Sequence, residues 1–227
     1  MKNQYFGDIN DYQKYSLLRT ITQVTRLRLA VCWMLTPDDG RSDGRKTAYL
    51  HNSAKWRSFD PELYDVLKAA VTSSRRCIQV AEDGRILPRA VFQSAVLHDD
   101  RTSRAGYFDR LEILIGDSDL VFFDPDNGME VKSKPKGRKG SSKYLYWDEA
   151  KRISGLGKSL IAYQHFARVK RDVFVADLCR RFQAECGTGW VGVLRTANVA
   201  YFVIPAKAHE AELQTACAEA RRKWDRM

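Results

Sequence analysis

Two apolar segments near the end of the chain constrain its fold more than any other feature. "WVGVLRT" and "NVAYFVIPA" are both rich in the β-branched and aromatic residues that favour strands. Their strand cores are separated by only two or three residues, so the two segments must pair as an antiparallel hairpin. A sheet that contains this hairpin holds at least one strand that runs against its neighbours.

Upstream of the hairpin, strand patterns alternate with helix patterns. Strands are predicted at 27–35, 76–83, 89–97, 120–125 and 159–166. Helices are predicted at 11–25, with Asp11 as cap, at 60–71, 107–115, 147–155 and 171–186, and at 208–224. This alternation is typical of a doubly wound α/β sandwich. The fold class predicted is therefore a Rossmann-like, mostly parallel sheet that ends in an antiparallel hairpin.

Length and composition predict one domain that spans residues 1–227. The 227 residues are 44% hydrophobic, enough for one substantial core. No apolar run reaches the roughly 18 residues that span a bilayer, and the first residues, "MKNQYFGDINDY", contain no apolar signal region. We therefore expect a cytoplasmic protein without membrane contact, whose five cysteines are free thiols.

The charge balance favours a polyanionic partner. Lys and Arg number 38 against 28 Asp and Glu, which gives a net charge of +10. A basic loop at 132–143 carries Lys132, Lys134, Lys136, Arg138, Lys139 and Lys143. These side chains are candidates to bind the phosphates of RNA or DNA, and Tyr144, Tyr146 and Trp147, just past the loop, are candidates to stack on a base. A merely solvated loop and a core aromatic residue are the alternatives.

The strand "LVFFDPDNG" brings polar groups to its carboxyl end, where open α/β sheets bind ligands. The Asp124 carboxylate and the Pro125 carbonyl are two acceptors suited to the two donors of an amino group. Asp126 and Asn127 follow directly. His165 ends the strand that we expect beside this one, and is a candidate for a catalytic or substrate role.

The order of elements resembles that of class I methyltransferases, which bind S-adenosylmethionine. In members that methylate amino groups, this strand end carries a D-P-P-Y or N-P-P-Y motif. Asp124 and Pro125 match its first half, whereas Asp126 and Asn127 depart from its second half. The resemblance implies that the acidic side chain and a backbone carbonyl orient the target nitrogen.

The segment "GDINDYQKYSLLR" is similar to a second motif. It resembles the amino-terminal G-x-x-x-D-x-x-K-H segment of the large-subunit ribosomal RNA adenine-N6 methyltransferases, and also the three-Cys-motif partner proteins. Gly7, Asp11 and Lys14 match, and Tyr15 stands where the family has histidine. The resemblance implies that the three matched residues border the methyl-donor site. From the residues alone, a helix cap at Asp11 and a solvated Lys14 remain open.

Further cofactor contacts are expected from the loop "TPDDGRSDG" and from the segment "IQVAED". In the loop, Thr36, Asp38 and Gly40 are the candidates, and its three acids, which include Asp43, suit a cationic group better than a pyrophosphate. An acid after the next strand commonly holds a ribose, and Glu82 is so placed. A plain turn at "EDG" is the alternative.

These features together predict an enzyme, an N-methyltransferase that uses S-adenosylmethionine and acts on an exocyclic amino group of a nucleic-acid base, with no metal required. The first alternative is a Mg²⁺-dependent nuclease that uses Asp124, Asp126, Glu130 and Lys132. The second is a non-catalytic RNA-binding module on a degenerate methyltransferase fold.

Overall fold

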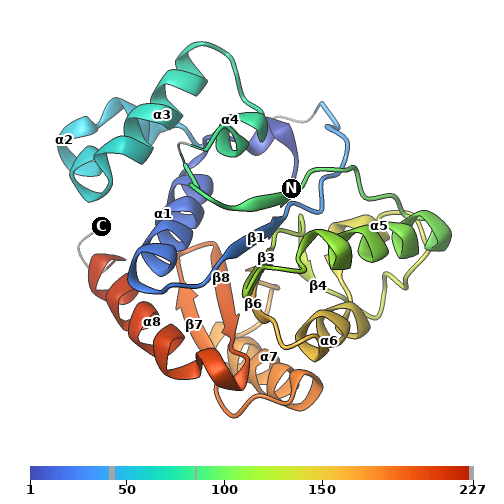
Figure 1. The fold of residues 1–227 in the computed structure, drawn as a ribbon. Helices are drawn as coiled ribbons and strands as arrows, with labels where there is room; N and C mark the ends of the chain where they lie inside the picture. Colours follow the sequence, from blue (N-terminus) through green and yellow to red (C-terminus); the bar gives the residue numbers. More distant parts are fainter. Residues whose placement is uncertain (41–43, 85, 225–227) are drawn as a thin grey trace.

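The computed structural model describes residues 1–40, 44–84 and 86–224. Its main sheet has six strands in the order β2-β1-β3-β6-β8-β7 (Figure 1). Their bounds are Val91–Gln93, Leu29–Cys32, Leu120–Phe123, Ser159–His165, Val199–Ile204 and Gly192–Arg195, respectively. Neighbours among β2, β1, β3 and β6 are parallel, and β8 is antiparallel to both β6 and β7. The predicted hairpin therefore places one antiparallel strand in an otherwise parallel sheet.

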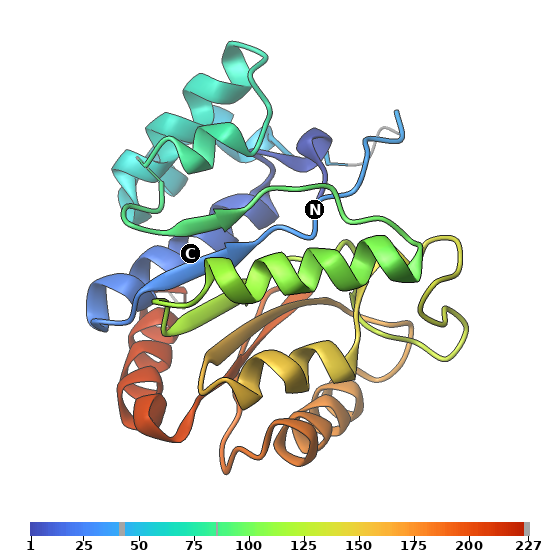
Figure 2. The same ribbon diagram turned by 45° about the vertical axis from the view of Figure 1, so that its right-hand side comes forward.

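Helices cover both faces of this sheet (Figures 1 and 2). The helices that form one layer are α1 (Ile9–Val24), α3 (Pro61–Thr72) and α8 (Glu210–Trp224). Those on the opposite face are α5 (Arg101–Leu114), α6 (Trp147–Gly155) and α7 (Arg171–Cys186). Two single-turn helices, α2 (Ser53–Trp56) and α4 (Gln79–Glu82), lie near α3. The doubly wound, Rossmann-like fold predicted from the sequence is confirmed.

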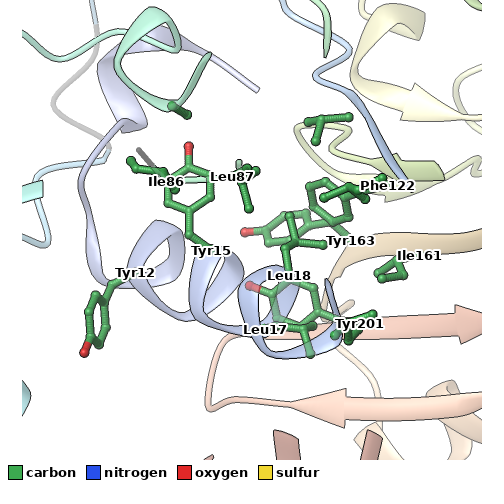
Figure 3. Packing of buried hydrophobic residues seen from close by; sticks show 14 of the residues in the cluster. Tyr12, Tyr15, Leu17, Leu18, Ile86, Leu87, Phe122, Ile161, Tyr163 and Tyr201 are labelled. Atoms are coloured by element: carbon green, nitrogen blue, oxygen red, sulfur yellow. The ribbon is translucent and has the colours of Figure 1, made fainter. Parts of the chain in front are cut away.

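The alternation of side chains along each strand divides the core into two halves. Val31, Phe122 and Ile161 belong to the half that packs against α1 and α8, and their immediate neighbours in sequence belong to the half under α5, α6 and α7. Leu18 of α1 belongs to the same buried cluster as Phe122 and Ile161, and Figure 3 shows these residues on α1 and on the sheet. A side chain two residues beyond Phe122 must also face α1, which fixes the direction of Asp124.

Helix α1 begins one turn earlier than its sequence pattern predicts. The cap is Asp8, not Asp11, because the Asp8 carboxylate accepts hydrogen bonds from the backbone N–H groups of Asn10 and Asp11. Asp11 lies in the first turn, which leaves its own carboxylate available for other partners.

The strand predicted at 76–83 is wrong. Residues Gln79–Glu82 form α4, and the two buried apolar residues there, Ile78 and Ala81, are three apart, as one helical turn requires. A two-stranded parallel sheet of β4 (Gly128–Met129) and β5 (Tyr144–Leu145) was not predicted, because two residues are too few to show a period. None of the described helices is long and apolar enough to cross a membrane.

Candidate functional site

Asp124 stands at the carboxyl end of β3 and faces α1. Its backbone N–H donates to the Cys32 carbonyl at 3.0 Å, so the β1–β3 ladder extends to this residue. The residue is only 2% exposed. An ionised carboxylate at such depth requires a charged or hydrogen-bonding partner.

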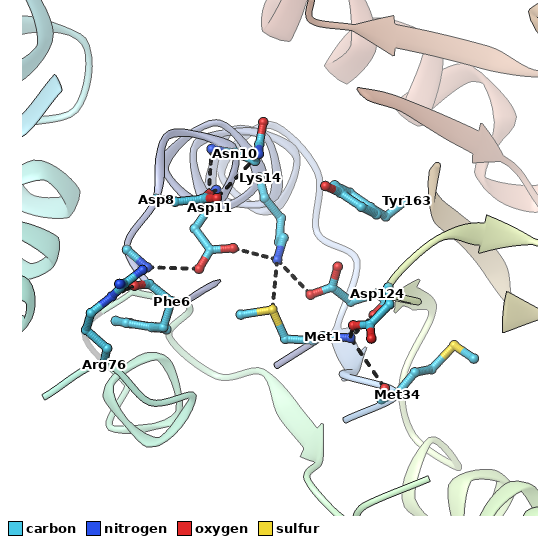
Figure 4. Close-up of polar contacts among 12 residues, drawn as sticks. Met1, Phe6, Asp8, Asn10, Asp11, Lys14, Met34, Arg76, Asp124 and Tyr163 are labelled. Atoms are coloured by element: carbon cyan, nitrogen blue, oxygen red, sulfur yellow. Dashed lines mark hydrogen bonds and ion pairs between the residues drawn. The ribbon is translucent and has the colours of Figure 1, made fainter. Parts of the chain in front are cut away.

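The partner of Asp124 comes from the amino-terminal motif (Figure 4). The Gly7 N–H donates to Asp11 Oδ2 at 3.0 Å, and Lys14 Nζ donates to Asp11 Oδ1 at 2.7 Å. Lys14 Nζ also donates to Asp124 Oδ2 at 2.7 Å. The glycine, aspartate and lysine of this motif thus form one chain of hydrogen bonds that ends on the Asp-Pro strand end.

Lys14 is held in its charged form. Burial alone would lower the pKa of its amine, but the Asp11 and Asp124 carboxylates outweigh that effect and raise it. The amine also lies within 6.0 Å of the ring centroids of Trp33 and Tyr163. One lysine therefore bridges two buried acidic side chains. Burial raises the pKa of Asp11, and its contacts with Lys14 act against that rise.

Asp126, two residues further on, is bound from another direction. Its Oδ2 accepts from the Thr36 hydroxyl at 2.8 Å, and its Oδ1 lies 2.8 Å from the Met1 amino nitrogen. The same nitrogen donates to the Asp124 carbonyl at 2.8 Å. Burial acts to raise the pKa of Asp126, but the Met1 and Thr36 contacts outweigh it, so the pKa lies below its usual range.

These groups line a cavity of about 620 Å³, which we call the central cavity. Its walls come from the amino-terminal segment with the first turns of α1, from residues 44–46, from residues 124–127 and from the end of β6. The volume is in the range of small-molecule and cofactor sites. Among the predicted site residues, those that line it are Asp11, Lys14, Asp124, Pro125, Asp126, Asn127 and His165.

Several wall residues were missed by the sequence prediction, among them Asp8 and Tyr163. Asp8 is buried. Burial is the larger cause, and repulsion from Asp11 the smaller one, of a rise in the pKa of its carboxyl group to about 7. Tyr163 precedes His165 by two residues on β6 and therefore shares its face. The sequence did contain a signal for both residues. Asp8 lies three residues, about one helical turn, before Asp11, and Tyr163 lies two residues before His165 on the same strand, so each faces the same way as a predicted site residue.

His165 lies at the rim of the cavity, and part of its side chain reaches solvent. Its Nε2 is 3.2 Å from the Tyr163 hydroxyl. Burial of the ring within the cavity wall lowers the pKa of His165, and the nearby Asp124 and Asp126 only partly offset this. The imidazole is therefore neutral at pH 7, able to accept or donate one hydrogen bond.

The other predicted cofactor residues, which are Gly7, Thr36, Asp38, Gly40 and Glu82, do not line the cavity. The Thr36 hydroxyl donates a hydrogen bond to Asp126, which lines the cavity. Asp38 accepts a hydrogen bond from the Gln4 backbone N–H at 3.2 Å. Gly40 is at the surface with open space around it, and Asp43 is outside the described residues. Glu82 comes from α4 instead of a strand end, yet it accepts from Trp33 Nε1 at 2.8 Å just beyond β1.

The basic loop is anchored at its base by a buried arginine. Arg104 of α5 binds Glu149 and also donates to the carbonyls of Ser141 and Tyr144. Lys136 is paired with Asp148 and Glu149. The remaining predicted cations are Lys132, Lys134, Arg138 and Lys139, which are exposed, and Lys143, which is half-buried.

Tyr146 cannot stack on a base in this arrangement. It is 4% exposed, its hydroxyl donates to the Lys134 carbonyl, and its ring is flanked by Arg104 and Lys136 at 4.7 and 4.9 Å. The stacking role predicted for it is wrong for this conformation, because the ring already has cations against it.

The carboxylate cluster of the nuclease alternative is not assembled. Asp124 and Asp126 bind the groups described above, whereas Glu130 lies 3.5 Å from Arg181 Nη2 and lines a hollow beneath the basic loop together with Lys132. Over residues 1–40, 44–84 and 86–224, no three His, Cys, Asp or Glu side chains converge as metal ligands.

Comparisons with known proteins give one structural likeness. Neither a scan against protein-family models nor a search of curated proteins finds a match. Among solved structures, the crystal structure of human methyltransferase-like protein 13 in complex with SAH aligns with a TM-score of 0.37 and 15% identity, over 93% of this chain and 88% of that chain. The fold class assigned here rests on the strand order of this chain's own sheet.

Proposed function

We propose that the protein is an S-adenosylmethionine-dependent methyltransferase that acts on an exocyclic amino group of a nucleic-acid base. One observation carries the proposal. The two motifs that resemble methyltransferases lie far apart in sequence, yet Lys14 joins them directly through its 2.7 Å contact with Asp124, across 110 positions. They meet at the carboxyl edge of a sheet whose single antiparallel strand, β8, lies between β6 and β7.

The central cavity suits the methyl donor in size and charge. Its volume of about 620 Å³ accommodates a nucleoside with an amino-acid tail. Four acids, Asp8, Asp11, Asp124 and Asp126, line it together with the Met1 amino group, Lys14, Arg45 and Lys46, so the wall offers acceptors to the amino group of the donor's tail and cations to its carboxylate. When bound, the donor supplies an electrophilic methyl group.

Asp124 is the residue proposed to orient the target amine. Lys14 engages its Oδ2, and within the described residues no contact engages its Oδ1. That oxygen and the Pro125 carbonyl are available as two fixed acceptors, which would hold an NH2 group with its lone pair toward the methyl carbon. Fixing this approach converts an encounter between two molecules into a reaction within one complex.

The test is methyl transfer from radiolabelled S-adenosylmethionine to single-stranded RNA and DNA oligonucleotides of mixed sequence, followed by nucleoside analysis. We expect transfer to an amino-bearing base, reduced about 100-fold in Asp124→Ala, since a misplaced reacting group loses roughly this factor. Asp124→Asn keeps one acceptor and should lose less. Asp117→Ala, an exposed aspartate ahead of the same strand, is the matched control. Full activity in Asp124→Ala would refute the proposed role.

A further inference from the structure

The connection between β6 and α7 carries cations to the mouth of the central cavity. β6 ends at His165, which lines the cavity, and the next residues, 166–170, form the β6–α7 loop. Arg168 and Lys170 in this loop are exposed, as is Arg171, the first residue of α7. The sequence analysis assigned no role to any of them.

Internal contacts leave the loop with an excess of positive charge. Arg171 lies over the Phe166 ring at 4.9 Å, which shapes the loop without neutralising it. The nearest acid in sequence, Asp172, is paired with Arg195 at 2.6 Å. Neither Arg168 nor Lys170 has a side-chain hydrogen bond or ion pair in the part of the chain that the structure describes. Two exposed cations are therefore available to an outside anion.

The shape around the loop fits an extended partner. The loop and the turn of the β7–β8 hairpin border a separate hollow of about 690 Å³, whose first lining residue, Phe166, directly follows His165 of the central cavity. Arg45 and Lys46 line the central cavity itself and are also exposed. Exposed cations therefore come both from the cavity wall and from the loop that follows its residue His165.

We propose that the β6–α7 loop binds the phosphates of the nucleic-acid strand that presents its base to the central cavity. This inference rests on the proposed function for the identity of the strand. A base that enters the cavity must leave its stack, so the phosphates on either side of it lie at the cavity mouth. Arg168 and Lys170 on one side, with Arg45 and Lys46 on the other, supply the countercharges there.

The test compares two double variants that each remove one arginine and one lysine. Arg168→Ala/Lys170→Ala removes the loop cations, and Arg26→Ala/Lys207→Ala removes exposed cations from the opposite, amino edge of the sheet. Binding of a fluorescent single-stranded oligonucleotide is measured by anisotropy at several salt concentrations. The slope of log K against log salt is negative, and for single strands each lost phosphate contact lowers its magnitude by about 0.7. We expect a decrease of about 1.4 for the loop variant and little change for the control.

A slope that is the same in the loop variant as in the wild type would overturn the proposal. So would wild-type protein that binds anionic lipid vesicles but no oligonucleotide, since Val169 and Val173 beside the cations are 59% and 55% exposed. Titration with S-adenosylhomocysteine separates this test from that of the proposed function. If the protein binds the nucleoside and the loop variant has an unchanged salt slope, only the phosphate-binding role of the loop is refuted. If the loop variant has a salt slope of smaller magnitude but the protein binds no nucleoside, the role of the loop is supported and the proposed methyltransferase activity is contradicted.

Discussion

At the scale of single residues, Lys14 is the group on which the site most depends. It is buried and balances Asp11 and Asp124 at 2.7 Å each. Lys14→Met keeps the length of the side chain but leaves two buried carboxylates facing each other. We expect a loss of about 3–5 kcal/mol in the free energy of unfolding, measured with urea. Lys55→Met, which removes an exposed lysine, should change it by less than about 0.5 kcal/mol.

A triple variant separates charge from packing. Lys14→Met combined with Asp11→Asn and Asp124→Asn removes the whole charged group, so no carboxylate is left without a partner. It should recover part of the stability lost in Lys14→Met alone. If Lys14→Met were itself as stable as the wild type, the buried network described here would be wrong.

Asp8 gives the site a dependence on pH near neutrality. Its pKa is raised to about 7, mainly by burial, while an unfolded aspartate titrates near 3.9. Between these values the folded protein binds the extra proton, so Asp8 contributes stability below about pH 4 and loses that contribution as the pH rises to about 7. In Asp8→Asn, which retains a helix cap, this decline should be absent.

The measurement is the difference in free energy of unfolding between wild type and Asp8→Asn from pH 4 to pH 8. The account predicts that the wild type loses stability relative to the variant over this range and levels off above it. A constant difference would show that the carboxyl group of Asp8 titrates normally.

At the scale of elements, the entry into α1 depends on Gly7. Its φ is +82°, and a Cβ there would lie 2.7 Å from Val71 Cγ2 of α3. Gly7→Ala therefore adds a clash to the strain of a left-handed backbone. Gly40→Ala, at φ +68° with nothing within 4 Å, adds the strain alone. We expect Gly40→Ala to lose about 1–2 kcal/mol and Gly7→Ala clearly more, by urea denaturation. Equal losses would contradict the close packing of α1 against α3.

Arg104 of α5 is a main support for the base of the basic loop. Arg104, 1% exposed, holds Glu149 and the carbonyls of Ser141 and Tyr144. Arg104→Leu should remove these hydrogen bonds and increase amide hydrogen exchange across 141–145, although Asp99 still accepts from the Ser142 N–H. Arg110→Leu, on the exposed side of the same helix, should not. Unchanged exchange in Arg104→Leu would show that other contacts hold the loop.

At the scale of the whole molecule, long periodic elements were predictable and short ones were not. The bounds of α6 and α7 agree with their sequence patterns. Over nine and sixteen residues, the spacing of apolar residues is enough to distinguish the period of a helix from that of a strand. The four-residue α4 was mistaken for a strand, since one turn cannot show its period. The hairpin fixes the antiparallel direction of β8, whereas the order of the parallel strands, β2-β1-β3-β6, was not predicted because it depends on pairing between segments far apart in sequence.

The site was predictable in its members but not in its contacts. Each half of the Lys14–Asp124 pair was identified from its own motif, yet their meeting depends on how α1 packs across the end of β3. For Tyr146, the predicted role itself was wrong. We predicted that it stacks on a base because it lies near the basic loop in sequence, but Arg104 of α5 lies over its ring.

The most direct test of the whole account is calorimetric titration of the protein with S-adenosylhomocysteine and S-adenosylmethionine, with Mg²⁺ alone as a further titrant. The account predicts one nucleoside site per chain with a dissociation constant in the micromolar range, because a preformed, acid-lined cavity of about 620 Å³ lies at the carboxyl edge of the sheet. Absence of nucleoside binding at millimolar concentration would contradict it, and the non-catalytic RNA-binding module would then be the better description.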